Sequence, residues 1–538
     1  LGALLRAMAQ ALQKLPRLPE WISPDVLRRG HFPPLAEALN RVHMPVEMTD
    51  ILPDGPFWSR LAFDELLAGQ LALALVRAQL RRPAGDRNAG DGHLRRKIID
   101  ALPYALTVSQ QQAAAAIADD LRQPIRMLRL LQGDVGSGKT LVALHAMLIA
   151  AEAGAQASLL APTEILARQH YESLRRLFAG LGVEVAALTG RDKGAGREAT
   201  LMGLADGSVH ILVGTHAIFQ ETVGYRDLAL VVVDEQHRFG VAERLLLQAK
   251  GRSPHLLAMT ATPIPRTLTL AQYGEMDVSR LDEMPPGRQP IETRVVSEDR
   301  LDEVVDALGR HLADGHGDQG GQAYWVCPLV EESERSDLAA AEARAAALRR
   351  RFGDRVGLVH GRMKPPEKDA VMAAFAGGRL GVLVATTVIE VGVDVPNARL
   401  IVIEHADRFG LAQLHQLRGR VGRGEGRSVC LLLRGSALSE TSRARLALIR
   451  ETTDGFRIAE EDLRLRGGGE WLGTRQSGEM SFRLAPPDQL AELMACAQDD
   501  ARLLIDRDGG LEGPRGAAAR IALYLFDRDA GVQMLRSG

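Results

Sequence analysis

The stretch GDVGSGKT at residues 133–140 decides the fold of this chain. It fits the pattern Gly-x4-Gly-Lys-Ser/Thr, in which successive backbone N–H groups of a tight turn converge on phosphate oxygens. Glycines are needed because a Cβ would forbid the backbone angles of the turn. The lysine reaches the β- and γ-phosphates, and the last hydroxyl ligates Mg²⁺. We therefore predict that ATP and Mg²⁺ are bound through Gly133, Gly136, Ser137, Gly138, Lys139 and Thr140.

The segments on either side of this loop favour the same interpretation. Residues 127–132 (MLRLLQ) read as a short strand, and the Ala/Leu-rich residues 140–153 read as a helix. Strand, glycine turn and helix follow in the required order, and the helix N-terminus adds a favourable dipole for a bound phosphate. The alternative is a Gly/Ser surface loop with an accidental lysine, and these flanks count against it.

A second segment, about a hundred positions later, supplies carboxylates. The apolar run LALVVV at residues 228–233 suits a strand buried on both faces, and Asp234 and Glu235 follow directly. We predict that Asp234 holds Mg²⁺, through water, and that Glu235 orients and polarises the attacking water. Alone, such a pair is usually a solvated strand end. Together with the loop at residues 133–140 it predicts a nucleotide-triphosphate hydrolysis site.

Composition limits the partners of the chain. At 538 residues it is long enough for three or four domains, and 46% hydrophobic with 25% charged residues is ordinary for a soluble globular protein. A net charge of −2 means that nucleic acid could be held only by local patches, and 4% aromatic residues argue against extended base stacking. We expect phosphate contacts, with two arginine groups as candidates: Arg418, Arg420, Arg423 and Arg427, then Arg443, Arg445 and Arg450.

Cysteine usage and hydropathy point to a compartment. Cys327, Cys430 and Cys496 are far apart and form no CxxC pair, so neither a zinc site nor a disulfide framework is predicted. No apolar run approaches the ~18 residues of a membrane span, and no cleavable signal is present. We expect a cytoplasmic protein with no membrane partner.

Alternating apolar runs and helical stretches predict an α/β chain with two parallel sheets in tandem. The Pro/Gly-rich residues 284–290 read as the linker between them. Strands of the first sheet are expected at residues 127–132, 157–160, 209–213, 228–233 and 256–259. Strands of the second are expected at residues 323–327, 356–359, 381–384, 400–403 and 429–433.

The second series has no phosphate loop of its own but ends in QLHQLRGRVGR at residues 413–423. Arginines there can act on a nucleotide of the first domain only if the two domains face each other across a cleft. Arginine stabilisation of a transferring phosphoryl group is worth roughly 10³ to 10⁵ in rate. We predict this role for Arg420 and Arg423, with nucleotide turnover opening and closing the cleft.

Residues before about 100 differ in kind. Residues 63–80 form a Leu-rich helical stretch, and residues 83–93 form a polar loop. We interpret this region as a helical connector. A role limited to packing against the first sheet is an equally open alternative.

These segments resemble, in the right order, the motifs of superfamily 2 helicases, and most closely those of the RecG branch-migrating DNA helicases. The resemblance covers essentially the whole chain. It is carried by GDVGSGKT, APTEIL, DEQH, MTATPIPR, ATTVIEVGVDVP and QLRGRVGR, at residues 133–140, 161–166, 234–237, 259–266, 385–396 and 416–423.

The resemblance assigns further residues. It implies that Gln110 reads the adenine edge, that Asp394 meets the ribose, and that Gln416 joins Glu235 and the two arginines among the catalytic groups. It also implies that the region of Thr262 couples the nucleotide and DNA sites. Phosphates of a tracked strand would be held by Thr163, Thr189, Thr215 and Thr387.

The region after residue 450 is similar to the translocation motif that RecG shares with the transcription-repair coupling factor. Residues 454–467 and 473–478 carry this likeness, which implies a helical hairpin and loop that relay cleft closure to duplex DNA. Arg445, Arg466 and Gln476 fall at its functional positions. Without the resemblance this would be a Gly/Arg-rich surface loop. Residues 18–65 resemble the RecG connector and favour RecG over the coupling factor.

The resemblance implies two tandem RecA-like domains with helical regions on both sides. We expect a helical connector at 1–100, an ATP-binding domain at 101–287, a C-terminal helicase domain at 288–435, and a translocation-motif hairpin with further helices at 436–538. RecG proteins carry an N-terminal wedge, an OB-type barrel, and no β-rich region of that kind precedes Leu1. The chain also starts without Met, so we expect a fragment or a trimmed form.

The function that the resemblance implies is an ATP- and Mg²⁺-dependent double-stranded DNA translocase of the bacterial cytosol, associated with the nucleoid. It would remodel branched DNA, namely stalled forks and Holliday junctions, in recombination and repair, with 3′ to 5′ polarity. We expect a monomer and a single-strand-binding protein as partner. Alternatives are a coupling-factor-like translocase that displaces protein from DNA, and a DNA-binding module with a silent ATPase. Retention of Lys139, Asp234, Glu235, Arg420 and Arg423 argues against silence.

Overall fold

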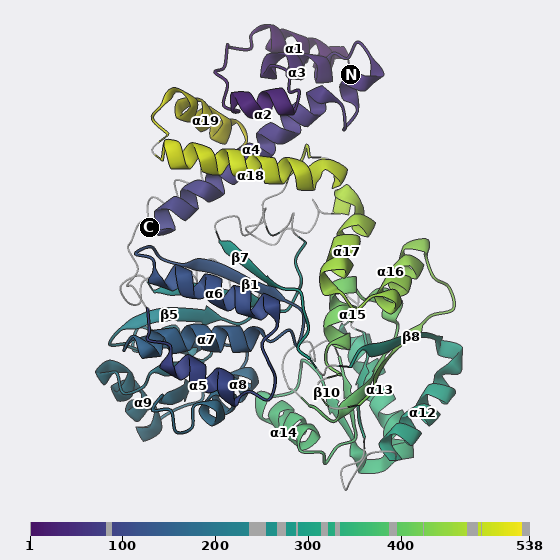
Figure 1. Ribbon diagram of the computed structural model, residues 1–538. Helices are drawn as coiled ribbons and strands as arrows, with labels where there is room; N and C mark the ends of the chain where they lie inside the picture. Colours follow the sequence, from purple (N-terminus) through teal and green to yellow (C-terminus); the bar gives the residue numbers. More distant parts are fainter. Residues whose placement is uncertain are drawn as a thin grey trace. The chain divides into compact units, whose positions relative to one another are not determined.

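The chain is seen in a computed structural model (Figure 1). The structure describes residues 2–81, 89–235, 254–265, 269, 276–286, 289–313, 321–328, 334–386, 395–422, 424, 426–470, 482–485, 487–509 and 511–529.

The contacts divide the chain into two compact units. The larger unit contains both sheets and spans Ala84–Pro263 and Val278–Asp462. The other unit combines the two terminal helical regions and spans Leu1–Pro83, Ile264–Asp277 and Leu463–Gly538.

The first sheet has seven strands in the order β3-β4-β2-β5-β6-β1-β7. The neighbouring pairs from β3 to β1 run parallel. Continuous apolar runs make the central strands, which are buried on both faces, as expected for a parallel sheet. The strands are β1 Leu128–Gly133, β2 Gln156–Leu160, β3 Val185–Leu188, β4 Ile211–Gly214, β5 Leu228–Val233, β6 His255–Thr260 and β7 Asp277–Leu281.

Helices cover this sheet and share its core. The helix α7 is buried along most of its length because its alanines and leucines pack against the sheet. Capping side chains set two helix starts: Thr107 accepts a hydrogen bond at the start of α6, and Thr163 does so at the start of α8. The helices are α5 His93–Ala101, α6 Val108–Arg122, α7 Lys139–Glu152, α8 Glu164–Leu177, α9 Ala195–Asp206 and the 3₁₀ turn η2 His216–Phe219.

The second sheet has six parallel strands in the order β10-β11-β9-β12-β13-β8. Its core centres on Trp325 and the aliphatic side chains of the central strands. The strands are β8 Ile291–Ser297, β9 Gln322–Val326, β10 Val356–Val359, β11 Val382–Ala385, β12 Ala398–Ile403 and β13 Ser428–Arg434.

Six helices and three 3₁₀ turns belong to this part of the chain within the described ranges. The helices are α12 Leu301–Ala313, α13 Glu334–Phe352, α14 Pro365–Ala376, α15 Leu411–Arg418, α16 Glu440–Glu451 and α17 Gly455–Glu470. The 3₁₀ turns are η4 Glu298–Arg300, η5 Gly353–Arg355 and η7 Ala406–Arg408.

All ten expected strands are present, with ends that differ by at most two residues. Three further strands, β3, β7 and β8, were not predicted. Each lies at the edge of a sheet, and each contains half-exposed residues. The strands β7 (DVSRL) and β8 (IETRVVS) lack the continuous apolar run that reveals a central strand, and the run VAAL of β3 is only four residues long.

The terminal helical regions share one hydrophobic core. The expected helix at residues 63–80 lies inside α4, and α18 packs along α4. The core includes Trp21, Phe63 and Met494, which come from opposite ends of the chain. The helices are α1 Gly2–Gln13, α2 Pro24–Arg29, α3 Leu35–His43, η1 Met48–Ile51, α4 Pro56–Arg81, α18 Pro487–Arg507 and α19 Pro514–Leu525.

Charged groups reinforce this helical core. Arg60 is fully buried and donates to Asp64 at 3.0 Å and to Glu20 at 2.9 Å. Glu65, the next acidic residue of α4, accepts the backbone N–H groups of Arg483 and Leu484. Because buried charges are tolerated only with such partners, α4 binds segments that are far apart in the sequence.

The expected domain limits stay a prediction. The first sheet ends at Leu281 and the second begins at Ile291, on either side of the expected limit at 287. The contact grouping divides the chain differently, because it places residues 1–83, 264–277 and 463–538 in one unit and both sheets in the other.

Two further expectations concern the state of the cysteines and the presence of membrane-spanning helices. Cys327 and Cys430 are buried, Cys496 is half-buried, and all three are free thiols. Throughout the part of the chain that the structure describes, every helix is too short or too polar to cross a bilayer.

One buried titratable group in α7 gives a test of this packing. Burial lowers the pKa of His145 to about 4, and the nearby Arg95 adds to this. The folded state therefore disfavours the charged ring, so the free energy of unfolding should fall as pH drops from about 6.5 to about 4, by at most ~1.4 kcal/mol per unit. His145→Gln should reduce the difference between the free energies of unfolding at pH 5 and pH 7.5, measured by denaturant unfolding. The exposed-residue control His43→Gln should keep the wild-type slope, and an equal slope in both variants would contradict the assignment.

Candidate nucleotide and nucleic-acid site

Parallel pairing brings the two predicted halves of the nucleotide site together. β6 lies between β5 and β1, with Val231 beside Leu256 and Leu130 beside Ala258. The carboxyl ends of parallel strands meet at one edge, so the loop after β1 and the acidic pair after β5 share that edge.

The loop after β1 has a backbone that only glycine allows. Gly136 and Gly138 have φ of 82° and 84°. A Cβ on Gly138 would lie 2.3 Å from the Gln110 side-chain nitrogen, and one on Gly133 would lie 2.4 Å from the Ser137 hydroxyl. The expected conformational role of these glycines agrees with the structure, because both the angle and the space exclude a side chain.

Lys139 begins α7 and is almost fully buried. Its ammonium group donates to the carbonyl oxygens of Gly133 at 2.7 Å and Asp134 at 2.8 Å. The buried Ser137 hydroxyl has no hydrogen-bond partner among the described residues. A buried cation, an unsatisfied hydroxyl and a helix N-terminus at one loop fit a triphosphate.

Gln110 has a role that the sequence did not reveal. It is 1% exposed, donates to the Ser137 carbonyl at 2.8 Å and accepts the Thr107 N–H at 3.0 Å. The side chain therefore braces the phosphate loop against the start of α6. One N–H and one lone pair of the amide are left for other partners, so adenine recognition by Gln110 stays a prediction.

The acidic pair is held from two sides. Asp234 lies 2.9 Å from the ring nitrogen of His170 on α8. Burial acts to raise the pKa of Asp234, but the His170 hydrogen bond and the Lys139 charge outweigh it, so the pKa lies below its usual value. His170 is a functional candidate that sequence reasoning missed, since a lone histidine on a helix carries no motif.

Glu235 differs from its neighbour in both conformation and electrostatics. Its φ is 55°, an uncommon angle for a residue with a side chain, and strain of this kind is often found at functional sites. Burial raises the pKa of Glu235, and the adjacent Asp234 charge raises it further, against the opposing effects of Lys139 and Arg420. A carboxylate with a raised pKa is suited to accept a proton from water.

The segment after β6 contacts the acidic pair. The Ala261 N–H points to a Glu235 carboxylate oxygen at 3.5 Å, and the hydroxyls of Thr260 and Thr262 lie 2.8 Å apart. These contacts connect the segment that contains Thr262 to Glu235 at the end of β5. Coupling of the two sites through Thr262 stays a prediction.

The second sheet contributes to this site through α15. Gly419 approaches the phosphate loop so closely that a Cβ would lie 2.8 Å from Val135. His415 lies 2.5 Å from the Asp134 carboxylate, and the Arg420 charge acts on Glu235. The stabilising role of Arg420 stays a prediction. Gln416 is half-buried on the same helix, and its catalytic role stays a prediction.

Several predicted residues fall outside what can be described. Arg466 lies within α17, but only the backbone of that residue is described. The predicted residues outside the described ranges are Thr387, Asp394, Arg423 and Gln476.

The first arginine group contains one residue that is not a surface ligand. Arg418 is 2% exposed and donates to the backbone carbonyls of Ile449 at 2.6 Å and Thr452 at 2.8 Å. The expectation of a nucleic-acid patch is therefore wrong for Arg418, because its buried guanidinium donates hydrogen bonds to backbone carbonyls at the end of α16. Arg445 is half-buried on α16, with a buried Nε that has no hydrogen-bond partner in the described part of the chain.

The predicted strand contacts divide into two kinds. Thr163 caps α8, with its hydroxyl accepting the Leu166 N–H at 3.4 Å, and Thr215 is buried before η2. Thr189 is fully buried, and both its hydroxyl and its N–H donate to Asp192, at 2.9 and 2.7 Å. The predicted strand contact at Thr189 is corrected, because its donors hold the turn after β3. The roles of Thr163 and Thr215 stay predictions.

Oxygen donors at the nucleotide site suit Mg²⁺. Thr140 lies exposed in the first turn of α7, and Asp234 ends the neighbouring sheet edge. Mg²⁺ prefers oxygen ligands and usually takes only one or two from protein, with phosphates and water completing the set. A hydroxyl and a carboxylate therefore fit the ion.

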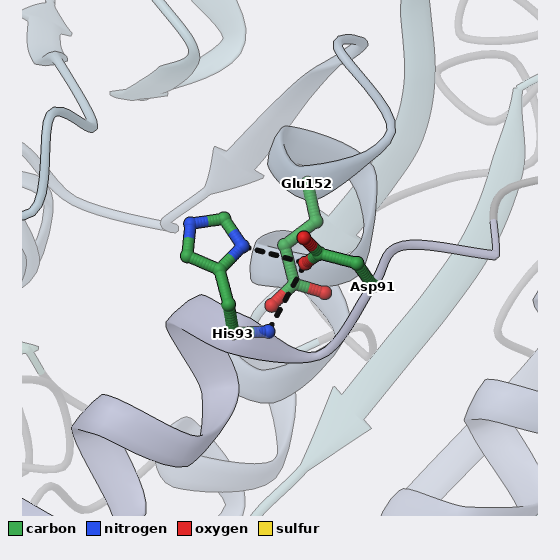
Figure 2. A group of neighbouring side chains, drawn as sticks. All are labelled: Asp91, His93 and Glu152. Carbon is green, nitrogen blue, oxygen red and sulfur yellow. Dashed lines mark hydrogen bonds and ion pairs between the residues drawn. The ribbon is translucent and has the colours of Figure 1, made fainter.

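A different cluster, Asp91, His93 and Glu152, brings three ligand-type side chains within 4.8 Å (Figure 2). Glu152 accepts backbone N–H groups from the first turn of α5 and the Arg95 guanidinium, at 2.9 to 3.1 Å. Asp91 accepts the His93 N–H at 3.0 Å. These oxygens already have donors, so the cluster caps the N-terminus of α5 rather than forming a metal site.

Comparison with protein families follows the same order along the chain. Residues 107–270 match the DEAD/DEAH box helicase family, and residues 302–425 match the helicase conserved C-terminal domain. Residues 452–522 match domain 3, C-terminal, of ATP-dependent DNA helicase RecG.

Whole-chain relatives decide the family. ATP-dependent DNA helicase RecG of Escherichia coli strain K12 is 48% identical over 475 residues, 87% of this chain and 68% of that protein. The Bacillus subtilis strain 168 relative, also an ATP-dependent DNA helicase RecG, is 44% identical over 96% of this chain and 75% of its own length. The chain belongs to the RecG family of ATP-dependent DNA helicases. The resemblance drawn from the motifs is confirmed.

Solved structures agree with this assignment. A structure of RecG bound to a three-way DNA junction has a TM-score of 0.72 and 40% identity, and the match covers 88% of this chain and 62% of that one. S. cerevisiae Dbp5 bound to RNA and ADP BeF3 shares the fold, with a TM-score of 0.50 at 17% identity, 76% of this chain and 97% of that one. The expected pair of RecA-like domains is confirmed, and this RecG-family chain spans about two thirds of the relatives it matches.

Removing the lysine should abolish nucleotide binding. Lys139→Ala removes the positively charged side chain that is expected to bind the phosphates, so the rate of ATP hydrolysis should fall by a factor of roughly 10² to 10³. The control Lys97→Ala, an exposed lysine on α5, should keep wild-type turnover. Binding of a fluorescent ATP analogue and phosphate release give the two measurements. Undiminished hydrolysis by Lys139→Ala would overturn the phosphate assignment.

Removing the carboxylate of Glu235 should separate binding from chemistry. Glu235→Gln keeps the shape but cannot accept a proton, so turnover should fall by roughly 10² to 10⁴ while ATP affinity stays near wild type. The exposed Glu221→Gln is the matched control. An unchanged turnover rate in single-turnover phosphate release would remove Glu235 from the mechanism.

Proposed function

We propose that this chain is an ATP-driven double-stranded DNA translocase that remodels branched DNA, including stalled replication forks and Holliday junctions. The observation that carries the proposal is the meeting of both sheets at one site. Gly419, at the end of α15, packs against Val135 of the phosphate loop, and His415 of α15 lies 2.5 Å from the Asp134 carboxylate. A nucleotide held there touches both lobes, so hydrolysis changes how the lobes are held together.

The residues divide the chemistry among them. Lys139 and the N–H groups of the loop bind the β- and γ-phosphates, and Thr140 and Asp234 hold Mg²⁺, which neutralises phosphate charge when it is bound. Glu235, whose pKa is raised by burial and by Asp234, orients water and takes its proton. Arg420 stabilises the charge that spreads over the transferring phosphoryl group.

Several lines support branched DNA as the substrate. The chain is 40% identical to RecG solved on a three-way DNA junction, and residues 452–522 match a domain named for RecG rather than for helicases in general. The net charge of −2 requires local phosphate contacts, with Thr163, Thr215, Arg445 and Arg466 as the proposed groups. We further propose 3′ to 5′ polarity, action as a monomer in the cytosol, and a single-strand-binding protein as partner.

A comparison of DNA substrates tests this function. ATP hydrolysis should be measured with no DNA, with linear duplex and with a model fork, at two salt concentrations. A branch-remodelling motor should be stimulated most by the fork, and stimulation should weaken with salt because phosphate contacts release counterions. Glu235→Gln is the background control. Equal rates in all three conditions would contradict the proposal, and rates no higher than the Glu235→Gln background would favour a silent ATPase. Duplex-only stimulation would limit the function to a translocase without branch preference.

A further inference from the structure

A continuous row of buried hydrogen bonds runs from the phosphate loop to the base of α17. Asp134, the second residue of the loop, lies 2.5 Å from His415 Nε2. His415 Nδ1 lies 2.8 Å from Arg418 Nη2, and Arg418 Nη1 donates to the carbonyls that end α16. Asp134, His415 and Arg418 are 7%, 5% and 2% exposed, so water does not compete for these bonds.

The chemistry of Arg418 fixes the proton on His415. A guanidinium group has only donors, so His415 Nδ1 must accept from Arg418. The ring then carries its proton on Nε2 and donates it to Asp134. The Asp134 carboxylate accepts from His415 Nε2 and from the Val135 N–H. Every bond in the row therefore has one donor and one acceptor, with His415 neutral.

The row begins beside the phosphate-binding cation. The ammonium group of Lys139 donates to the backbone carbonyl of Asp134 at 2.8 Å, and the Asp134 carboxylate also accepts the Val135 N–H at 2.8 Å. A change in how Lys139 and the loop are held, such as phosphate binding, therefore acts directly on the group that His415 contacts.

The Asp134–His415 pair lies against the first turn of α17. A Cβ on Gly455 would lie 2.6 Å from His415 Nε2 and 2.8 Å from an Asp134 carboxylate oxygen. Asp454 caps the same turn by accepting the N–H groups of Phe456 and Arg457. The start of α17 is thus packed directly on the Asp134–His415 pair, so a shift of that pair must be accompanied by a shift of this turn.

A second contact ties this turn to the first sheet. The Arg280 guanidinium of β7 lies 5.3 Å from the centre of the Phe456 ring. Residues 455 and 456 therefore touch groups from both lobes, and their position depends on how the lobes meet.

We propose that Asp134, His415 and Arg418 are positioning residues that lock the first turn of α17 to the phosphate loop, so that nucleotide-dependent movement of the loop moves α17. The inference rests on the proposed translocase function and names the groups that connect hydrolysis to movement. His415 acts as a fixed bridge with one donor and one acceptor.

Three variants test the bridge. In His415→Gln the side-chain amide can supply one donor and one acceptor, whereas His415→Leu supplies neither. His311→Leu, a half-buried histidine of α12 that contacts the Gln322 carbonyl, is the matched control. Each full-length variant is assayed for DNA-stimulated ATP hydrolysis and for triplex displacement, and base pairs travelled per ATP are calculated. Thermal unfolding checks that each variant folds.

The expected result separates coupling from chemistry. His415→Leu should still hydrolyse ATP but travel roughly two- to thirtyfold fewer base pairs per ATP, and His415→Gln and His311→Leu should stay near wild type. Wild-type distance per ATP in His415→Leu, or no rescue by Gln, overturns the proposal. A wild-type chain that hydrolyses ATP without any response to DNA would instead overturn the proposed function.

The position of the proton on the His415 ring gives a second test, and this test does not depend on the activity of any variant. ¹⁵N spectra of the chain labelled at histidine should contain a neutral ring with its proton on Nε2 at pH 7.5. That signal should be missing in His415→Gln. A His415 ring that is doubly protonated, or that carries its proton on Nδ1, is incompatible with the Arg418 bond and overturns the bridge.

Discussion

The parallel pairing of β5, β6 and β1 is the constraint on which the nucleotide site depends. It sets three carboxyl ends at one edge, where the phosphate loop, the Thr260 region and the acidic pair meet. Because each of these strands is buried on both faces, its register cannot slip without exposing apolar side chains to water. The site is thus held in place by the hydrophobic core of the first sheet rather than by its own polar contacts.

Burial then sets the electrostatics of that edge. The Lys139 charge acts to lower the pKa of both Asp234 and Glu235, and the Asp234 charge acts to raise the pKa of Glu235. The two carboxylates respond in opposite directions, because Asp234 has a histidine partner and Glu235 has a like-charged neighbour. Such divergence gives one acid for holding a cation and another for accepting a proton.

The meeting of two sheets adds groups that neither contains alone. α15 brings His415 to the phosphate loop and Arg420 to the acidic pair, while Arg418 turns away to hold the end of α16. Three nearby side chains of α15 and the turn that follows it thus serve the loop, the reaction and the next helix. This division explains how a chain with a net charge of −2 concentrates positive charge where phosphate is handled.

The sequence by itself determined the central strands, the phosphate loop, the acidic pair and the family, because buried strands need unbroken apolar runs and phosphate turns need glycine at fixed spacing. Tertiary structure decided the rest. The edge strands β7 and β8 carry no such run, and the roles of Gln110, Thr189 and Arg418 depend on partners brought close only by folding. The link from Asp134 to His415 joins residues 281 positions apart, and no local pattern records a contact of that kind.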